Sequence, residues 1–147
     1  MDLLDRLRAG VATATAEETR ELASGLAVLL PPDATLALHG DLGVGKTTFV
    51  QGLARGLGIA EPVTSPTFNL CRFYRGTGLG ARNLGHLDAY RLDNPAQVEA
   101  LLLDDFLQPP FCLAIEWPEK IAGWLPPGAW HFDLAITPDQ RHTVRLH

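Results

Sequence analysis

Hydrophobic and polar positions along this chain follow two different periods, which predict helices and strands in turn. Between residues 16 and 30 the apolar residues recur every three or four positions, as on one face of an α-helix. Thr15 and Glu18 stand three apart just before this stripe, a spacing that caps the start of a helix. Pro31 and Pro32 follow the stripe, so we expect the helix to end there.

Short apolar runs predict buried strands in the rest of the chain. The run "TLALH", residues 35–39, predicts a strand, and a helix is expected from about residue 45 to 57, with Gly58 as its stop. The run "FCLAIEW", residues 111–117, is apolar up to an acid, which is typical of a parallel strand covered on both faces. Further strands are expected at 68–75, 83–92, 129–137 and 141–147, the last two as a closing hairpin, and a helix is expected to open at Asn94 and Pro95.

A glycine-rich segment lies between the first of these strands and its helix. Gly40-Asp41-Leu42-Gly43-Val44-Gly45-Lys46-Thr47 fills the pattern G-x-x-x-x-G-K-[ST], and Thr48 follows it. Glycines at these positions let backbone N–H groups surround a phosphate at a helix N-terminus. The lysine reaches the β- and γ-phosphates, and the hydroxyl binds Mg²⁺. The chain has ten arginines and two lysines, and it places one lysine here, which favours a nucleoside triphosphate site over a chance glycine turn.

Length and composition agree with one globular domain. The chain has 147 residues, of which 46% are hydrophobic and 20% charged. Helices and strands alternate early, and strands dominate late. We therefore expect an α/β fold over residues 1–147, a P-loop NTPase sandwich with a mostly parallel central sheet and antiparallel additions.

Charge and hydropathy narrow the functional classes. The formal net charge of −5 argues against a protein that holds nucleic acid through its own phosphate contacts. No apolar run approaches the roughly 18 residues that span a bilayer, and the N-terminus does not resemble a secretory signal, so a cytoplasmic protein is expected. Cys71 and Cys112 lie in apolar segments without metal-ligand spacing and are expected to be buried, not to bind metal.

Acidic residues supply candidates for the remainder of the site. Glu116 ends the apolar run of residues 111–115, where an acid can steady Mg²⁺ beside a P-loop. Glu119 is a weaker candidate, better explained as a solvated residue at a helix start. In "HLDAYRL", His86 and Asp88 share one face of an extended segment. Asp88 could activate a nucleophile with His86 as its brace, or Asp88 and Arg91 could form a structural ion pair, and the pattern does not decide between these.

The loop "VTSPTF" carries three hydroxyls around a proline. Thr67 is its candidate for a switch residue that senses a γ-phosphate. An ordinary turn explains the Ser-Pro step equally well.

In this order, "GDLGVGKTTF", "SPTF", "HLDAYRL" and "EWPE" resemble the bacterial tRNA threonylcarbamoyladenosine biosynthesis ATPase family TsaE, also called YjeE. The resemblance runs from about residue 10 to residue 146. It implies a weak Mg²⁺-dependent ATPase that supports a tRNA-modifying complex through the subunits TsaB and TsaD. That complex places threonylcarbamoyl on N6 of adenosine 37 in tRNAs that read ANN codons.

The resemblance also implies roles for individual residues. It assigns ATP and Mg²⁺ binding to Lys46 and Thr47, the Mg²⁺-side acid to Glu116, hydrolysis to Asp88 and a switch to Thr67. The catalytic set is thus Lys46, Asp88, Glu116 and Thr67, and the metal set is Thr47 and Glu116. The nucleotide-binding set is Thr19, Asp41, Leu42, Gly43, Val44, Gly45, Lys46, Thr47, Thr48 and Trp117.

The chain departs from the family pattern in two places. Ala89 replaces a bulkier residue after Asp88, which removes no chemistry. Leu102 and Phe106 stand where relatives tend to carry Gly and Tyr after the acid of the middle helix, here Glu99. The second departure bears on partner contacts more than on ATP binding.

Two other functions fit the glycine motif. A P-loop kinase would pass phosphate to a small molecule, with Arg72, Arg75 and Arg82 as a short lid. The remaining chain looks too short for a separate acceptor domain. A nucleotide-binding module without turnover is the third possibility.

Overall fold

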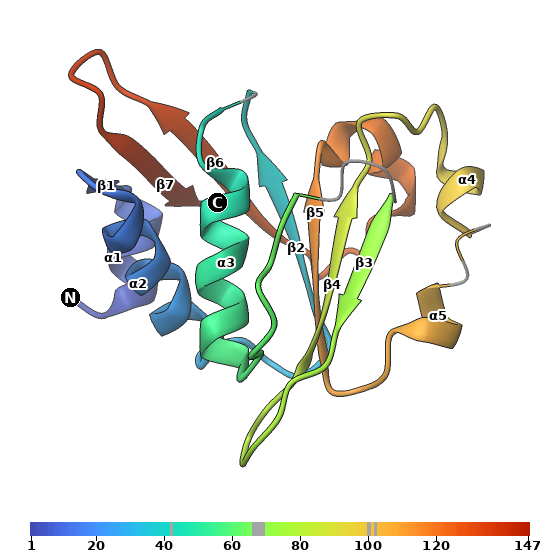
Figure 1. The fold of residues 1–147 in the computed structure, drawn as a ribbon. Helices are drawn as coiled ribbons and strands as arrows, with labels where there is room; N and C mark the ends of the chain where they lie inside the picture. Colours follow the sequence, from blue (N-terminus) through green and yellow to red (C-terminus); the bar gives the residue numbers. More distant parts are fainter. Residues whose placement is uncertain (42, 66–69, 100, 102) are drawn as a thin grey trace.

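The fold is a seven-stranded mixed sheet with helices on both faces, seen in a computed structural model (Figure 1). The structure describes residues 1–41, 43–65, 70–99, 101 and 103–147. The strands are β1 Val11–Thr13, β2 Ala34–His39, β3 Cys71–Tyr74, β4 Asn83–Asp88, β5 Phe111–Glu116, β6 Trp130–Ile136 and β7 His142–Leu146. The helices are α1 Leu3–Ala9, α2 Ala16–Ala27, α3 Lys46–Leu57, α4 Pro95–Glu99, α5 Leu103–Phe106 and the 3₁₀ segment η1 Pro118–Trp124.

The middle of the sheet is parallel and its edges are antiparallel. The strand order is β1-β7-β6-β2-β5-β4-β3. β2 pairs in parallel with β5 and β6, and β4 pairs in parallel with β5. β3, β7 and β1 join antiparallel, so the predicted mixed sheet with antiparallel additions is confirmed. The predicted closing hairpin is β6 and β7.

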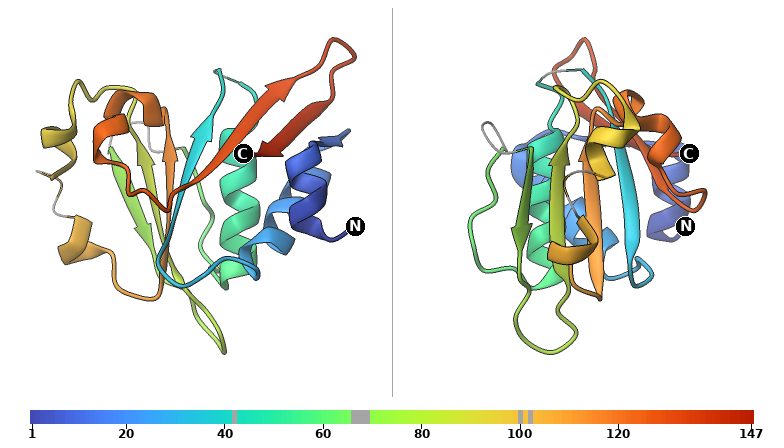
Figure 2. Two further views of the ribbon diagram at one scale, coloured as in Figure 1. Left: turned by 180° about the vertical axis from the view of Figure 1, so that it is seen from behind. Right: turned by 90° about the vertical axis from the view of Figure 1, so that its right-hand side faces the viewer.

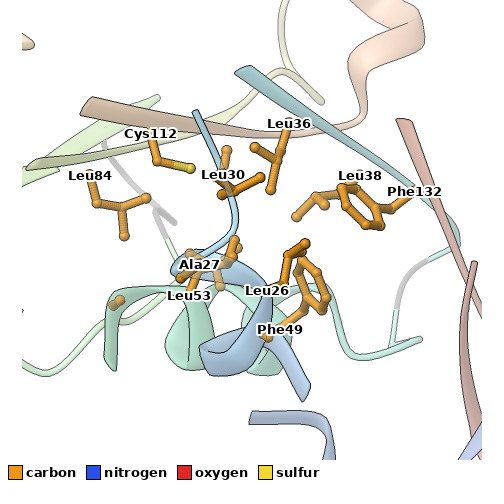
Figure 3. Close-up of a cluster of buried hydrophobic side chains, with 14 of the residues drawn as sticks. Leu26, Ala27, Leu30, Leu36, Leu38, Phe49, Leu53, Leu84, Cys112 and Phe132 are labelled. Carbon is orange, nitrogen blue, oxygen red and sulfur yellow. The ribbon is translucent and has the colours of Figure 1, made fainter. Parts of the chain in front are cut away.

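α1, α2 and α3 cover one face of the sheet (Figures 1 and 2). Their apolar stripes meet the inward side chains of β2, β5 and β6 in the larger core. Figure 3 shows this core. Leu26 of α2, and Leu30 just after the end of that helix, lie with Phe49 and Leu53 of α3. Leu36, Leu38 and Phe132 close it from the sheet, and all seven side chains are almost fully buried.

Helix boundaries follow the predicted local signals. The Thr15 hydroxyl accepts the Glu18 N–H at 3.1 Å, and the Glu18 carboxylate accepts the Ala14 N–H at 2.6 Å. Gly58 ends α3 with a φ of 83°, a left-handed conformation that glycine adopts without strain. The capping pair and the glycine stop are therefore confirmed.

The second face carries a smaller core beneath α4, α5 and η1 (Figure 2). Leu87, Leu113 and Ile115 point to this side from β4 and β5, and Val98 and Ile121 cover them. β5 therefore buries side chains on both faces, as its continuous apolar run predicted. None of the helices in the described ranges is long and apolar enough to cross a membrane.

The N-terminal helix α1 was not predicted from the sequence. Asp2 caps it by accepting the Asp5 N–H at 2.8 Å, and Leu7 is its one fully buried side chain. Its seven residues are too few for a clear periodic stripe, and Leu7 is buried only because α1 packs against the rest of the fold.

α2 and α3 approach each other closely along two glycines of α3. A Cβ atom on Gly52 would lie 2.4 Å from the backbone oxygen of Arg20, and one on Gly56 would lie 2.5 Å from that of Ser24. Both obstacles are backbone atoms, so relief requires the helices to move apart. This contact holds α3, and the loop before it, against the sheet.

Replacing Gly52 with alanine is expected to destabilise the protein by about 1 kcal/mol, because overpacking costs about 1–3 kcal/mol and the helix-propensity gain offsets only about 1 kcal/mol of it. Urea unfolding measures the change. Gly25→Ala in α2 is the matched control, since its Cβ would meet only the flexible end of Leu3, at 3.3 Å. Equal stability of the two variants would contradict the close helix contact.

Candidate functional site

The candidate site lies where β2, β4 and β5 end, at one edge of the sheet (Figure 1). The glycine loop, residues 40–45, joins β2 to α3 at this edge. Glu116 of β5 has two register partners, Asp88 of β4 on one side and Leu38 of β2 on the other. Because parallel strands bring their carboxyl ends together, the loop and both acids share one edge.

The backbone of the glycine loop requires glycine at several positions. Gly40, Gly43 and Gly45 have φ values of 150°, 84° and 98°. A Cβ on Gly40 would lie 2.5 Å from the Leu134 oxygen, so the loop sits tightly against β6. Leu42, also assigned to the nucleotide, lies outside the described residues.

The N-terminus of α3 opens toward this loop without a side-chain cap. Gly45 is the N-cap residue and supplies no side chain, while its carbonyl accepts the Phe49 N–H at 2.9 Å. The first N–H groups of a helix have no partner within it. Those of Lys46, Thr47 and Thr48 therefore suit an anion, the role predicted for this segment.

Lys46 is buried although it is charged, with 4% of its surface exposed. Its Nζ donates to the Gly40 oxygen at 2.6 Å and lies 3.9 Å from the centre of the Trp117 ring. Burial lowers the pKa of Lys46, while Glu116 and three further carboxylates oppose this shift, in the order Glu119, Asp88 and Asp41. The acids of three separate segments thus converge on one ammonium group.

Four other residues of the predicted set lie in the loop and in the first turn of α3. Thr47 and Thr48 are half-buried in the first turn of α3, and Asp41 is exposed in the loop. Val44 is buried, with 8% of its surface exposed, and its carbonyl faces the His142 ring. The structure therefore places every described member of the predicted loop set at one site.

The two predicted acids differ in their surroundings. Glu116 is buried, and its Oε2 lies 2.6 Å from Nε2 of His86. Asp88 is half-buried, and its Oδ1 accepts the Tyr90 N–H at 3.0 Å. Within the described residues His86 bonds to Glu116 and makes no hydrogen bond to Asp88, so the alternative in which His86 braces Asp88 is not supported. None of the ion pairs within the described residues joins Asp88 to Arg91.

Trp117 extends the site beyond Glu116. Its φ of 57° is unusual for a residue with a side chain. Its ring lies 5.2 Å from the Tyr90 ring, centroid to centroid, and over the ammonium of Lys46. A cation held over an aromatic face is stabilised by the ring's quadrupole. The structure therefore brings Trp117 to the glycine loop.

Thr19 lies on the other side of the loop. Its Oγ1 is 2.6 Å from that of Thr13, and 3% of its surface is exposed. Thr13 pairs with His142, whose Nδ1 lies 3.0 Å from the Val44 oxygen. The Thr19 hydroxyl is therefore engaged with Thr13, and contact between Thr19 and the nucleotide stays a prediction. Thr67, the predicted switch residue, lies outside the described residues.

Two groups of residues at this edge were missed by sequence reasoning. His142 reaches the glycine loop from β7, about a hundred positions along the chain, so only the strand order reveals it. His39, just before Gly40, lies with Nε2 2.9 Å from Nδ1 of His131, and the two rings are stacked. The His147 ring lies tilted beside them, with its centroid 6.4 Å from each of the other two. Glu119, exposed in η1, lies 3.9 Å from Nδ1 of His39.

The site offers few side chains that could bind a divalent cation. Within the described ranges, no cluster of three or more His, Cys, Asp or Glu side chains could hold a metal by itself. Mg²⁺ is typically bound by one or two carboxylates together with substrate phosphates. The Glu116 carboxylate and the Thr47 hydroxyl, beside a helix end suited to phosphate, match that donor set.

The two cysteines lie apart from this site. Both are free, Cys112 is fully buried and Cys71 is half-buried. Burial raises the pKa of each thiol to about 12, so neither is a reactive thiolate near neutral pH. The expected burial is confirmed for Cys112 and only partly met by Cys71.

Fold and site together define a mixed α/β protein in which a central parallel strand passes through a glycine loop into a helix. Residues 13–144 match the model of the family described as "Threonylcarbamoyl adenosine biosynthesis protein TsaE". The chain belongs to the TsaE family, as its motifs indicated.

Individual relatives are similar over different shares of their length. The proteins named "tRNA threonylcarbamoyladenosine biosynthesis protein TsaE" include one from Bacillus subtilis, 40% identical over 78% of this chain and 69% of its own. The one from Synechocystis is 46% identical over 65% of this chain and 61% of its own. That from Treponema pallidum is 34% identical over 90% of this chain and 95% of its own.

A solved structure agrees with the fold. The crystal structure of Bacillus subtilis YdiB superposes with a TM-score of 0.70 and 31% sequence identity. The match covers 93% of this chain and 82% of that chain.

The histidine beside the loop gives an expected pH dependence of stability. Burial, and then the neighbouring His131, lower the pKa of His39 in the folded protein. As the pH is lowered, His39 therefore takes up a proton in the unfolded chain at a higher pH than in the folded protein. The free energy of unfolding should consequently fall as the pH drops below about 6.5. Urea unfolding between pH 5 and pH 8 should show a shallower pH slope for His39→Gln than for the unchanged protein. An equal slope would contradict this assignment.

Proposed function

We propose that this protein binds ATP and Mg²⁺ at the glycine loop, hydrolyses the ATP, and thereby supports N6-threonylcarbamoyladenosine modification of tRNA adenosine 37. The observation that carries the proposal is the meeting of an uncapped helix N-terminus, buried Lys46 and buried Glu116 at one sheet edge. Membership in the TsaE family supports the link to this modification.

The triphosphate has a suitable place on the loop and on α3. Backbone N–H groups of residues 43–48 supply donors, and the helix dipole favours negative charge at this end. Among the described residues, Lys46 Nζ donates to one acceptor, the Gly40 carbonyl, so its remaining protons can turn toward phosphate oxygens. Trp117, which lies over that ammonium, adds an aromatic wall near the nucleotide.

Thr47 and Glu116 are the residues that would hold Mg²⁺. Mg²⁺ would neutralise the charge that develops on the phosphates during transfer. Glu116 contributes a carboxylate from the end of β5, and the Thr47 hydroxyl comes from the first turn of α3. In our proposal Thr67 senses the γ-phosphate as a switch residue.

Asp88 is the residue proposed to act on the attacking water. It stands at the end of β4 beside Glu116, yet it is more exposed, and only its Oδ1 is engaged by the backbone. Its second oxygen can accept a proton from water or orient it. Water adds to the γ-phosphorus, the bond to the bridging oxygen breaks, and ADP, phosphate and a proton leave.

A small-molecule kinase is less well supported. Its lid would need the arginines around the β3–β4 loop, but Arg82 N–H donates to Leu57 O at 3.0 Å, at the C-terminal end of α3. The glycine loop lies at the other end of this twelve-residue helix, about 18 Å away. Arg72 instead donates to the Thr64 hydroxyl at 3.2 Å.

The proposed partners are proteins, namely the TsaB and TsaD subunits of the threonylcarbamoyl transferase complex, in the cytoplasm. A net charge of −5 supports action on such a complex, since tight direct binding of tRNA depends on cationic contacts to phosphates. Strong direct nucleic-acid binding and membrane binding are not part of this proposal.

The function is tested by following free phosphate from purified protein with ATP and Mg²⁺, with and without TsaB and TsaD. Slow release that rises when the partners are added is expected. Transfer of the γ-phosphate to a metabolite, with no free phosphate, would instead support the kinase.

Two substitutions separate binding from turnover. Lys46→Ala should weaken ATP binding by roughly 100-fold, because a charged donor to the phosphates is lost. Asp88→Ala should retain binding and lose roughly 10²–10⁴-fold in turnover. Isothermal titration and single-turnover phosphate release measure these effects.

Matched controls are available for both changes. Lys120→Ala removes the other lysine of the chain, which is exposed, and Asp93→Ala removes an exposed acid outside the site. Normal turnover in Asp88→Ala would remove Asp88 from the mechanism.

A further inference from the structure

His86 is buried beside the proposed metal-side acid. None of its surface is exposed, and its Nε2 lies 2.6 Å from Oε2 of Glu116. β4 and β5 pair in parallel, with His86 opposite Ala114 and Asp88 opposite Glu116. Glu116 is thus two pairs further along the ladder, which puts it on the same face as His86.

Hydrogen bonding restricts the protonation of this ring. Nδ1 of His86 is buried and has no partner within the described residues. A protonated ring, an imidazolium, would leave an Nδ1–H donor buried without an acceptor. The neutral tautomer with its proton on Nδ1 would have the same unpaired donor, and its Nε2 lone pair would point at the lone pairs of the carboxylate. The neutral ring with its proton on Nε2 avoids both costs, so His86 donates to Glu116.

Burial also excludes some roles for His86. His86 has no exposed surface, whereas Asp88 is half-buried, so we leave contact with the attacking water to Asp88. Replacing a buried charged pair with apolar side chains is often neutral or stabilising, so packing alone does not require a histidine here. The property that an apolar side chain such as leucine could not supply at this position is the hydrogen bond to Glu116.

The other oxygen of Glu116 is free for the site. Within the described part of the chain, the His86 bond to Oε2 is the one side-chain hydrogen bond that Glu116 makes. Glu116 is also the first of the charges that oppose the lowering of the Lys46 pKa, so its carboxylate acts on the loop lysine. Fixing Oε2 in this way leaves Oε1 without a side-chain partner among the described residues.

We propose that His86 is a positioning residue that holds the Glu116 carboxylate in one orientation through Nε2–H, which would leave Oε1 available to the Mg²⁺ that Glu116 and Thr47 would hold. The inference rests on the proposed function. Outer partners of this kind orient metal-binding carboxylates, and their loss typically costs about 10–100-fold in metal affinity.

Glutamine and asparagine at position 86 form a matched pair for the test. A glutamine amide can place an N–H donor near the position of Nε2, whereas the shorter asparagine places it near that of Nδ1. Mn²⁺, followed by electron paramagnetic resonance, is titrated onto each protein with a non-hydrolysable ATP analogue.

His86→Gln should bind Mn²⁺ within about threefold of the unchanged protein, and His86→Asn about 10–100-fold more weakly. Affinity for the analogue in EDTA should be the same in all three proteins. Equal Mn²⁺ affinity in all three, or equal losses in both variants, would overturn the positioning role.

A second measurement does not depend on any variant. Nitrogen chemical shifts of His86 in the nucleotide-free protein should show a neutral ring protonated on Nε2. An imidazolium or an Nδ1–H tautomer would overturn the inference even if the variants fail to fold. If the unchanged protein binds no analogue in EDTA, the proposed nucleotide site fails, while the ring shifts still report on the bond to Glu116.

Discussion

The parallel pairing of β2 with β5 is the constraint on which the rest of the structure depends. It sets Leu38 opposite Glu116, so the residue that precedes the glycine loop by two positions lies beside the acid at the end of β5. β4 then adds in parallel on the far side of β5 and brings Asp88 to the same edge. A slip of one residue would turn Glu116 to the other face, away from Lys46.

Burial of Lys46 explains why so many acids meet here. A buried ammonium is costly unless its charge is compensated. Glu116, Glu119, Asp88 and Asp41 favour its charged form, the Gly40 carbonyl accepts its hydrogen bond, and it lies over the Trp117 ring. Together these groups compensate the buried charge, and Nζ keeps protons that an anion can accept.

Local chemistry could be predicted from the sequence, and contacts between distant segments could not. Thr15 and Gly58 act through neighbouring backbone, so their roles follow from residues within one helical turn. The position of Glu116 followed from an apolar run, because a parallel strand needs such a run to be covered on both faces.

Contacts of the site depend on strand order. His142 reaches Val44 because β7 and β6 lie beyond β2, and no local pattern encodes that order. The partner of His86 depends on the register of β4 against β5, which is set by packing of the two cores. Sequence spacing placed His86 and Asp88 on one face correctly, but it gave no means of choosing between Asp88 and Glu116 as the partner of His86.

In the proposed function the two acids of the site have separate tasks, because their surroundings differ. Glu116 is buried, and one of its oxygens is held by the His86 ring, which suits a ligand that must keep one orientation. Asp88 is more exposed, and within the described residues its one side-chain hydrogen bond is with the Tyr90 N–H, so its other oxygen can meet solvent. Since a fixed acid suits a metal and an accessible one suits water, the difference in burial across a single register pair would divide the proposed chemistry between them.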